Sequence, residues 1–198
     1  MPFEIRPYCA DDLSAIYKIC LQTADGGKDA SHLFNIKELI GDYYAAPYAV
    51  LEPEVCFVVF FNNEACGYIV GCRSSQNFSE QCETDWFPVL RDKYPLNSNS
   101  ISPLNEHLIE LIHDGYKPRP EFKEYPAHLH INLLSNTQGH GLGGKLIKTF
   151  IDNLKKLKVS GVHLEVSSDN YGAIAFYEKV GFKVICEFEG SIGYGMSL

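Results

Sequence analysis

The segment SNTQGHGLGGKLI, residues 135–147, places four glycines within six residues, directly ahead of an apolar run with helical spacing. A glycine-rich loop that opens a helix presents unpaired backbone N–H groups and the positive end of the helix dipole to an anion. Three phosphate-binding patterns can be drawn through this segment: G-x-G-x-x-G, most of G-x-x-x-x-G-K-[ST], and Q-x-x-G-x-G. Residues outside the loop therefore have to decide which anion it binds.

Alternating strand and helix patterns around the loop predict an α/β sheet. The expected strands are 3–8, 55–61, 65–72, 128–134, 161–166 and 182–189, with 191–198 as a last edge strand. The expected helices follow a cap at Asp11 or Asp12, lie around 34–44, and span 141–157 and 171–180. The sheet should be antiparallel in its N-terminal part, with a parallel pair of strands flanking the glycine loop.

Residues 74–126, between the third and fourth expected strands, differ from the rest of the chain. Helical pieces near 77–93 and 104–112 are mixed with prolines, and the segment is too short to own a large core. We expect an inserted cap that covers one end of the sheet, within a single domain spanning residues 1–198.

Composition narrows the classes of function. The 198 residues are 45% hydrophobic with a net charge of −8, and such an acidic chain argues against a nucleic-acid partner. No apolar run approaches about 18 residues and no secretory signal is visible, which argues against a membrane partner. Seven scattered cysteines without C-x-x-C suit a reducing compartment, so we expect the cytoplasm, with the nucleus as a second location.

Two of the three loop patterns fit poorly. The G-K-[ST] pattern needs a hydroxyl after the lysine to ligate magnesium, and Leu146 stands there. The G-x-G-x-x-G pattern of dinucleotide-binding folds has its first glycine at the strand's tip, but Gly139 comes several residues later. Glu165, the candidate ribose ligand, also lies inside its strand.

The third pattern is extended by a second motif about thirty residues on. Gln138–Gly143 reads Q-x-x-G-x-G, and Asn170–Phe182 reads N-x-x-A-x-x-F-Y-x-x-x-G-F. This pair resembles the GNAT superfamily of acetyl-CoA-dependent N-acetyltransferases. The segments PEVCFVV (53–59), CGYIVG (66–71) and YPAHLHINLL (125–134), with DWFPVLRDKYP (85–95), are similar to GNAT proteins related to the acetyltransferase-like domain of protein O-GlcNAc hydrolases.

The resemblance implies where acetyl-CoA binds. Its diphosphate would lie on the loop residues Gln138, Gly139, His140, Gly141, Leu142, Gly143 and Gly144, where a side chain at Gly141 or Gly143 should obstruct it. The pantetheine arm would pair with the main chain of Leu133 and Leu134, where one N–H would polarise the thioester carbonyl. Asn170 would contact the cofactor arm, with a plain helix cap as the alternative.

Tyr177 matches the family tyrosine that protonates the departing thiolate, a proton transfer for which a phenol is suited. We expect Phe176 to fill the core so that Tyr177 faces the cleft.

The general base is less defined, because the strand before the loop carries no carboxylate. One face of that strand holds His128, His130 and Asn132, and we select His130, since histidine titrates near pH 6.5. Buried, hydrogen-bonded histidines are the alternative, and Glu165, Asp25 and Asp85 are further candidates. The acceptor site should lie between residues 24–29 and the insertion, with Asp25 attracting a cation and Trp86 lining the pocket or anchoring the insertion.

The sequence thus predicts acetyl transfer from acetyl-CoA to a primary amine, on a small molecule or a protein lysine, by direct attack in a ternary complex. No metal is required, and the expected assembly is a monomer or homodimer. The alternative is a GNAT-like module that binds acyl-CoA or a protein partner without turnover.

Overall fold

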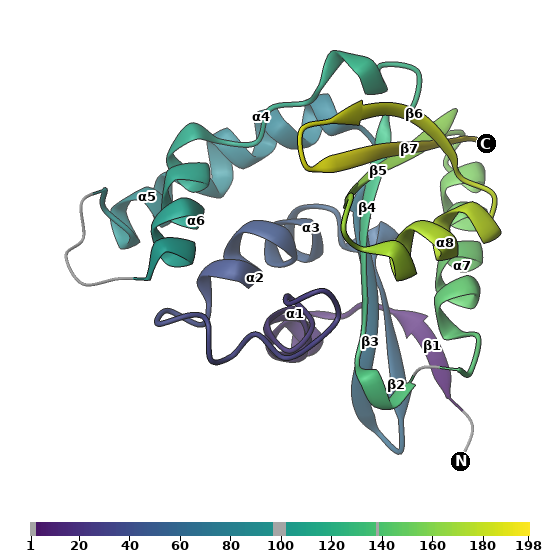
Figure 1. Ribbon diagram of the computed structural model, residues 1–198, viewed down its shortest axis with the longest axis horizontal. Helices are drawn as coiled ribbons and strands as arrows, with labels where there is room; N and C mark the ends of the chain where they lie inside the picture. Colours follow the sequence, from purple (N-terminus) through teal and green to yellow (C-terminus); the bar gives the residue numbers. More distant parts are fainter. Residues whose placement is uncertain (1–2, 97–101, 138) are drawn as a thin grey trace.

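The chain forms one seven-stranded sheet, in a computed structural model that describes residues 3–96, 102–137 and 139–198 (Figure 1). The strand order is β1-β2-β3-β4-β5-β7-β6, and the described strands are β1 Glu4–Pro7, β2 Phe57–Phe61, β3 Glu64–Cys72, β4 Ala127–Leu133, β5 Gly161–Ser167, β6 Lys183–Phe188 and β7 Ser191–Ser197. All neighbours are antiparallel except β4 and β5. The predicted mixed sheet with one parallel pair is confirmed.

The β2–β3 turn follows the sequence signal for a tight hairpin. Asn62 and Asn63 both have positive φ, of 51° and 65°. Two consecutive residues with left-handed backbone conformation give the turn a twist that matches the flanking strands, and asparagine tolerates positive φ well.

The sequence suggested that the last strand lies at the edge of the sheet, but the structure places it inside. β7 lies between β5 and β6, so β6 is the edge strand. Its glycines make this possible: a Cβ at Gly193 would lie 2.6 Å from the Phe122 ring, and one at Gly195 would lie 2.9 Å from Ile185. Glycines that weaken a strand pattern here serve close packing inside the sheet.

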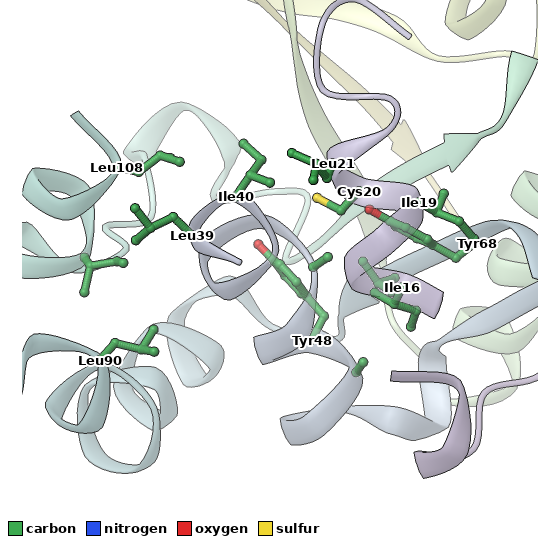
Figure 2. Packing of buried hydrophobic residues seen from close by; sticks show 14 of the residues in the cluster. Ile16, Ile19, Cys20, Leu21, Leu39, Ile40, Tyr48, Tyr68, Leu90 and Leu108 are labelled. Carbon is green, nitrogen blue, oxygen red and sulfur yellow. The ribbon is translucent and has the colours of Figure 1, made fainter. Parts of the chain in front are cut away.

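Helices cover both faces of the sheet. One face carries α1 Leu13–Leu21, α2 Leu39–Tyr44, α3 Ala46–Leu51, α4 Ser75–Asp85, α5 Phe87–Lys93 and α6 Pro103–Asp114, and the other carries α7 Leu142–Lys156 and α8 Tyr171–Lys179. Figure 2 shows that α1, α2, α5 and α6 contribute to one apolar cluster. The helices of the inserted segment, α4, α5 and α6, therefore share one apolar core with α1, α2 and α3. Within the described residues, no helix is both long and apolar enough to cross a membrane.

The insertion is fastened to α2 by Asp42. Its buried carboxylate accepts hydrogen bonds from Tyr94 Oη (2.8 Å), Lys93 Nζ (3.2 Å) and the Tyr17 hydroxyl. Trp86 Nε1 donates to the Asp42 carbonyl oxygen at 2.8 Å. Asp42 thus joins α1 and α2 to the C-terminal end of α5.

The start of the first helix, the bounds of the second and one further helix differ from the sequence-based expectations. Asp12 stands at the N-cap position of α1, but its side chain caps the 3-10 turn Ala10–Asp12 that leads into the helix: its carboxylate accepts from Cys9 N at 2.9 Å and pairs with Arg6 at 2.7 and 2.8 Å. The helix expected around 34–44 is helical only from Leu39, and the sequence pattern did not reveal α3.

Candidate active site

The glycine loop follows the far end of β4, several residues beyond the point where β4 and β5 stop pairing. The parallel register joins Ala127 to Val162 and His128 to His163 and goes no further, whereas β4 stays paired with β3 up to Leu133. The β5-facing backbone groups of residues 129–133 therefore have no strand partner. An extended ligand can form hydrogen bonds with such an unpaired strand edge.

Of the two predicted main-chain contacts, Leu133 and Leu134, only Leu133 offers a free amide. Leu134 N donates to Cys66 O at 3.0 Å, and Leu134 O accepts from Thr137 N and Thr137 Oγ1 at 2.9 and 2.6 Å. Because successive residues of a strand direct their N–H groups to opposite sides, the Leu133 amide points toward β5. Leu133 is therefore the better placed of the two amides, and the contact of either residue with the pantetheine arm stays a prediction.

The loop brings open backbone to the start of α7. Gly139 and Gly141 have φ of +80° and +68°, Gly141 is the residue before the helix, and a Cβ at either position would meet nothing within 4 Å. Lys145 N donates to Gly141 O, so the preceding amides of Leu142, Gly143 and Gly144 belong to the unpaired first turn. Three adjacent N–H groups at a helix N-terminus are able to bind an anion.

The other loop residues differ in role. A Cβ at Gly143 would lie 3.0 Å from two ring atoms of Phe176, so this glycine lets α7 approach α8, a packing reason that the sequence did not reveal. The Leu142 side chain is in the core, which leaves only its main chain for a ligand. His140 is exposed beside the Phe3 ring. Gln138 lies outside the described residues.

Tyr177 is the buried member of the aromatic pair on α8, and Phe176 is half-buried, which reverses the expected order. Its ring packs against Phe182 and Tyr194. Burial raises the pKa of Tyr177 to about 12. The Tyr177 hydroxyl has no hydrogen-bond partner among the described residues. Of the side-chain oxygens and nitrogens in those residues, only Tyr68 Oη is both fully buried and unpaired, so the Tyr177 oxygen is not fully buried. The Tyr177 hydroxyl therefore reaches solvent while its ring stays in the core.

Asn170 caps α8, since its Oδ1 accepts from Ala173 N at 3.1 Å. This is the alternative role that the sequence left open, and the cofactor contact stays a prediction.

Three histidines lie on one face of β4 and β5. Burial lowers the pKa of His130 and His163 to about 4 and that of His128 well below its usual value, so all three are neutral at pH 7. His130 Nε2 lies 3.2 Å from Tyr48 Oη, and His128 Nε2 lies 2.8 Å from the same oxygen. Tyr48 is 82 residues from His130 in the sequence, so no local pattern could have indicated this contact.

The carboxylates named from the sequence are less well placed for catalysis. Glu165 pairs with Arg119 at 2.9 Å and accepts from Ser191 Oγ at 3.2 Å, so it is not a free base. Asp25 is exposed in a turn closed by Lys28 N bonding to its carbonyl.

Trp86 is half-buried in the first apolar cluster with its N–H donated to Asp42 O, which fits an anchor of the insertion. Thr23 Oγ1, just after α1, accepts from Asn132 Nδ2 on β4 at 2.6 Å. The start of the loop formed by residues 24–29 therefore lies beside the face of β4 that carries His128 and His130.

The fold is a mixed α/β sheet that opens between β4 and β5, with a glycine-rich helix start after β4. Comparison with known proteins identifies the family. Residues 31–182 match the sequence profile of the acetyltransferase (GNAT) family, so the chain belongs to that family.

Individual proteins are also similar to this chain. Rat protein O-GlcNAcase is 25% identical over 192 residues, which cover 95% of this chain and 21% of the relative, and the mouse protein is also 25% identical. The chain thus spans about a fifth of the length of these curated relatives. The solved structure of SsHAT superposes with a TM-score of 0.92 at 35% identity, covering 100% of this chain and 98% of the other.

A PaiA N-acetyltransferase from Thermoplasma acidophilum, solved with coenzyme A, has a TM-score of 0.61 at 16% identity, covering 100% of both chains. This more distant likeness concerns the fold.

Proposed function

We propose that this protein is an acetyl-CoA-dependent N-acetyltransferase that moves the acetyl group to a primary amine, on a small molecule or a protein lysine, by direct attack in a ternary complex. The observation that carries the proposal is the open first turn of α7. Gly144 lies in that helix without positive φ, and a Cβ there would meet nothing within 4 Å. The described fold gives no reason for glycine at this position, whereas a ligand lying on the backbone does.

The diphosphate of the cofactor would accept hydrogen bonds from the amides of Leu142, Gly143 and Gly144, with its negative charge at the positive end of a 15-residue helix. A coenzyme A complex of the distant PaiA relative supports this choice of ligand. The pantetheine arm would extend along the unpaired edge of β4. There the Leu133 N–H would donate to the thioester carbonyl and to the oxyanion that forms from it.

The reaction forms a C–N bond and breaks a C–S bond. The amine nitrogen attacks the thioester carbon, the carbonyl electrons move to oxygen, and the positively charged nitrogen of the intermediate loses a proton. Collapse of the intermediate expels the thiolate, which takes a proton from the Tyr177 hydroxyl. A phenol is protonated at neutral pH, and burial raises the pKa of Tyr177 further, to about 12, so its donor form is fully populated.

His130 would receive the proton from the nitrogen. With a pKa of about 4 it is too weak a base to deprotonate a free alkylammonium ion efficiently. The nitrogen becomes far more acidic once the C–N bond has formed, so a neutral imidazole suffices at that stage. The acceptor would therefore have to reach the site as the free amine, and Asp25 remains a candidate for attracting its cationic form from solution.

A thiol-release assay with acetyl-CoA and a panel of amines tests the proposal. The panel should contain a polyamine, an aminosugar, a lysine peptide and a simple alkylamine. We expect release that depends on both enzyme and amine. Tight acetyl-CoA binding without release for any amine would contradict the proposal and support the non-catalytic module, which the absence of a carboxylate on β4 favours.

A further inference from the structure

A continuous line of polar contacts runs from the backbone beneath the insertion to His130. Ser75 Oγ lies 2.9 Å from Pro126 O and 2.7 Å from His128 Nδ1. On the other side of the same ring, Tyr48 Oη lies 2.8 Å from His128 Nε2 and 3.2 Å from His130 Nε2. Ser75, His128 and Tyr48 are 5%, 4% and 4% exposed, so these contacts lie away from bulk solvent.

The first two contacts determine the proton positions on His128. A carbonyl oxygen only accepts, and a serine hydroxyl has a single proton. If Ser75 gave that proton to His128, its oxygen would face the Pro126 oxygen at 2.9 Å with no proton between them. Both short contacts are satisfied only when Ser75 donates to Pro126 O and His128 Nδ1–H donates to Ser75 Oγ.

The remaining proton positions follow in sequence. A neutral imidazole carries one N–H, so His128 Nε2 is an acceptor and Tyr48 donates its hydroxyl proton to it. The Tyr48 oxygen then has only lone pairs to offer His130. His130 Nε2 must therefore carry the proton and donate it to Tyr48.

This assignment leaves His130 Nδ1 as the nitrogen with a lone pair. Nδ1 has no hydrogen-bond partner among the described residues. In those residues only Tyr68 Oη is both unpaired and fully buried, so Nδ1 is not fully buried. His130 Nδ1 therefore reaches solvent. Figure 2 shows Tyr48 within the packed core beside α2.

We propose that Tyr48 is a positioning residue, which together with Ser75 and His128 holds His130 in the Nε2–H tautomer and so presents the Nδ1 lone pair to the acceptor nitrogen. The tautomer itself follows from the contacts alone, while its use in proton transfer rests on the proposed function. The partner of one ring nitrogen decides the protonation state of the other, as carboxylates and carbonyls bonded to metal-binding histidines do.

Nitrogen-15 NMR of imidazole-labelled protein tests the tautomer directly, because protonated and unprotonated ring nitrogens have well-separated shifts. In the wild type we expect His130 to be protonated at Nε2 alone. In Tyr48→Phe, an Nε2–H would have no buried acceptor, while an Nδ1–H could donate to water. A substantial Nδ1–H population should therefore appear. His130 protonated at Nδ1 in the wild type, or a tautomer unaffected by Tyr48→Phe, would overturn the inference.

Ser75→Ala provides a second test that does not alter any atom touching His130. Without Ser75 Oγ, His128 Nδ1 is left with the Cys72 thiol at 3.1 Å and the Tyr116 hydroxyl at 3.4 Å, both of which can donate. His128 should then become protonated at Nε2 and donate to Tyr48, which would donate to His130 Nε2. We therefore expect His130 to change to the Nδ1–H tautomer. An unchanged His130 spectrum would contradict the chain of proton positions.

The matched control is Tyr44→Phe. The Tyr44 ring packs edge-on against His130 at 5.7 Å, but its hydroxyl makes no hydrogen bond to that ring among the described residues, so the tautomer should not change. If the enzyme turns over, Tyr48→Phe and Ser75→Ala should lower kcat/KM for the amine by about tenfold or more while leaving the Kd for acetyl-CoA unchanged. A protein without turnover would refute the proposed function, and the NMR spectra would still decide the tautomer.

Discussion

The four loop glycines have different physical reasons for being glycine. Gly139 and Gly141 adopt positive φ, and Gly143 makes room for the Phe176 ring. Gly144 has neither reason, and glycine inside a helix costs about 1 kcal/mol relative to alanine. A residue that weakens its own helix and contacts nothing is best explained by a ligand that needs the space.

Tyr177→Phe tests the proton donor. Phenylalanine keeps the packing against Phe182 and Tyr194 and removes only the hydroxyl. We expect kcat to fall about 100-fold or more, in the range typical for losing a general acid, with little change in the Kd for acetyl-CoA. Stopped-flow detection of thiol release together with calorimetric titration measures both quantities. A variant as fast as the wild type would show that another group or water protonates the thiolate.

Sequence reasoning located the loop and Tyr177 but not their neighbours. The glycine motif is local, so its position at a helix start was predictable. Which of two adjacent aromatic residues is buried depends on how α8 is rotated against the sheet, and the sequence of one short helix does not determine this. Tyr48 and Ser75 were not predictable, because they reach the histidines from 82 and 53 residues away.

At the scale of elements, Asp42 joins α1, α2 and the end of α5. Its carboxylate accepts from Tyr17, Lys93 and Tyr94, and an asparagine would direct an NH₂ group at one or more of these donors. We expect Asp42→Asn to lower the free energy of unfolding by about 2–3 kcal/mol, the typical cost of leaving buried donors unpaired. Urea denaturation followed by circular dichroism measures the change.

The control for Asp42→Asn is Asp152→Asn. Asp152 pairs with Lys148 on the exposed surface of α7, and such pairs contribute about 0.5 kcal/mol or less. Equal effects of the two substitutions would show that the Asp42 contacts do not hold the insertion in place.

Most elements were predictable because their signals are short-range. The apolar face of α7, the Asn-Asn turn and the alternating strands all follow from local spacing. The position of β7 was not, because its glycines resemble an exposed strand until Phe122 and Ile185 are known to pack against them. The continuity of the insertion with the first apolar cluster likewise depends on contacts between distant segments.

At the scale of the whole molecule, the buried histidines make stability depend on pH. Burial lowers the pKa of His163 to about 4, below the value near 6.5 expected in an unfolded chain. Between these values the unfolded chain binds a proton that the folded protein does not, so the free energy of unfolding falls as the pH falls. For His163 the loss should reach about 2 kcal/mol by pH 5, and His128 and His130 act in the same direction.

Urea denaturation at pH 7, 6 and 5 measures this dependence. His163→Gln should flatten it, whereas His107→Gln should not, since the His107 side chain is 63% exposed. Parallel pH profiles for the wild type and His163→Gln would contradict the assignment of a neutral, buried His163.

The most direct measurement is the Kd for acetyl-CoA of Gly144→Glu beside Gly144→Gln, two variants of nearly equal size that differ in charge. A carboxylate in the first turn of α7 favours the helix, so the thermal stability of Gly144→Glu should equal or exceed that of Gly144→Gln. A diphosphate on the same amides would meet that charge at a few ångströms, where repulsion of several kcal/mol is expected near a protein surface. The account therefore predicts that Gly144→Glu binds acetyl-CoA at least about tenfold more weakly than Gly144→Gln. Equal affinities in two folded variants would show that the diphosphate binds elsewhere.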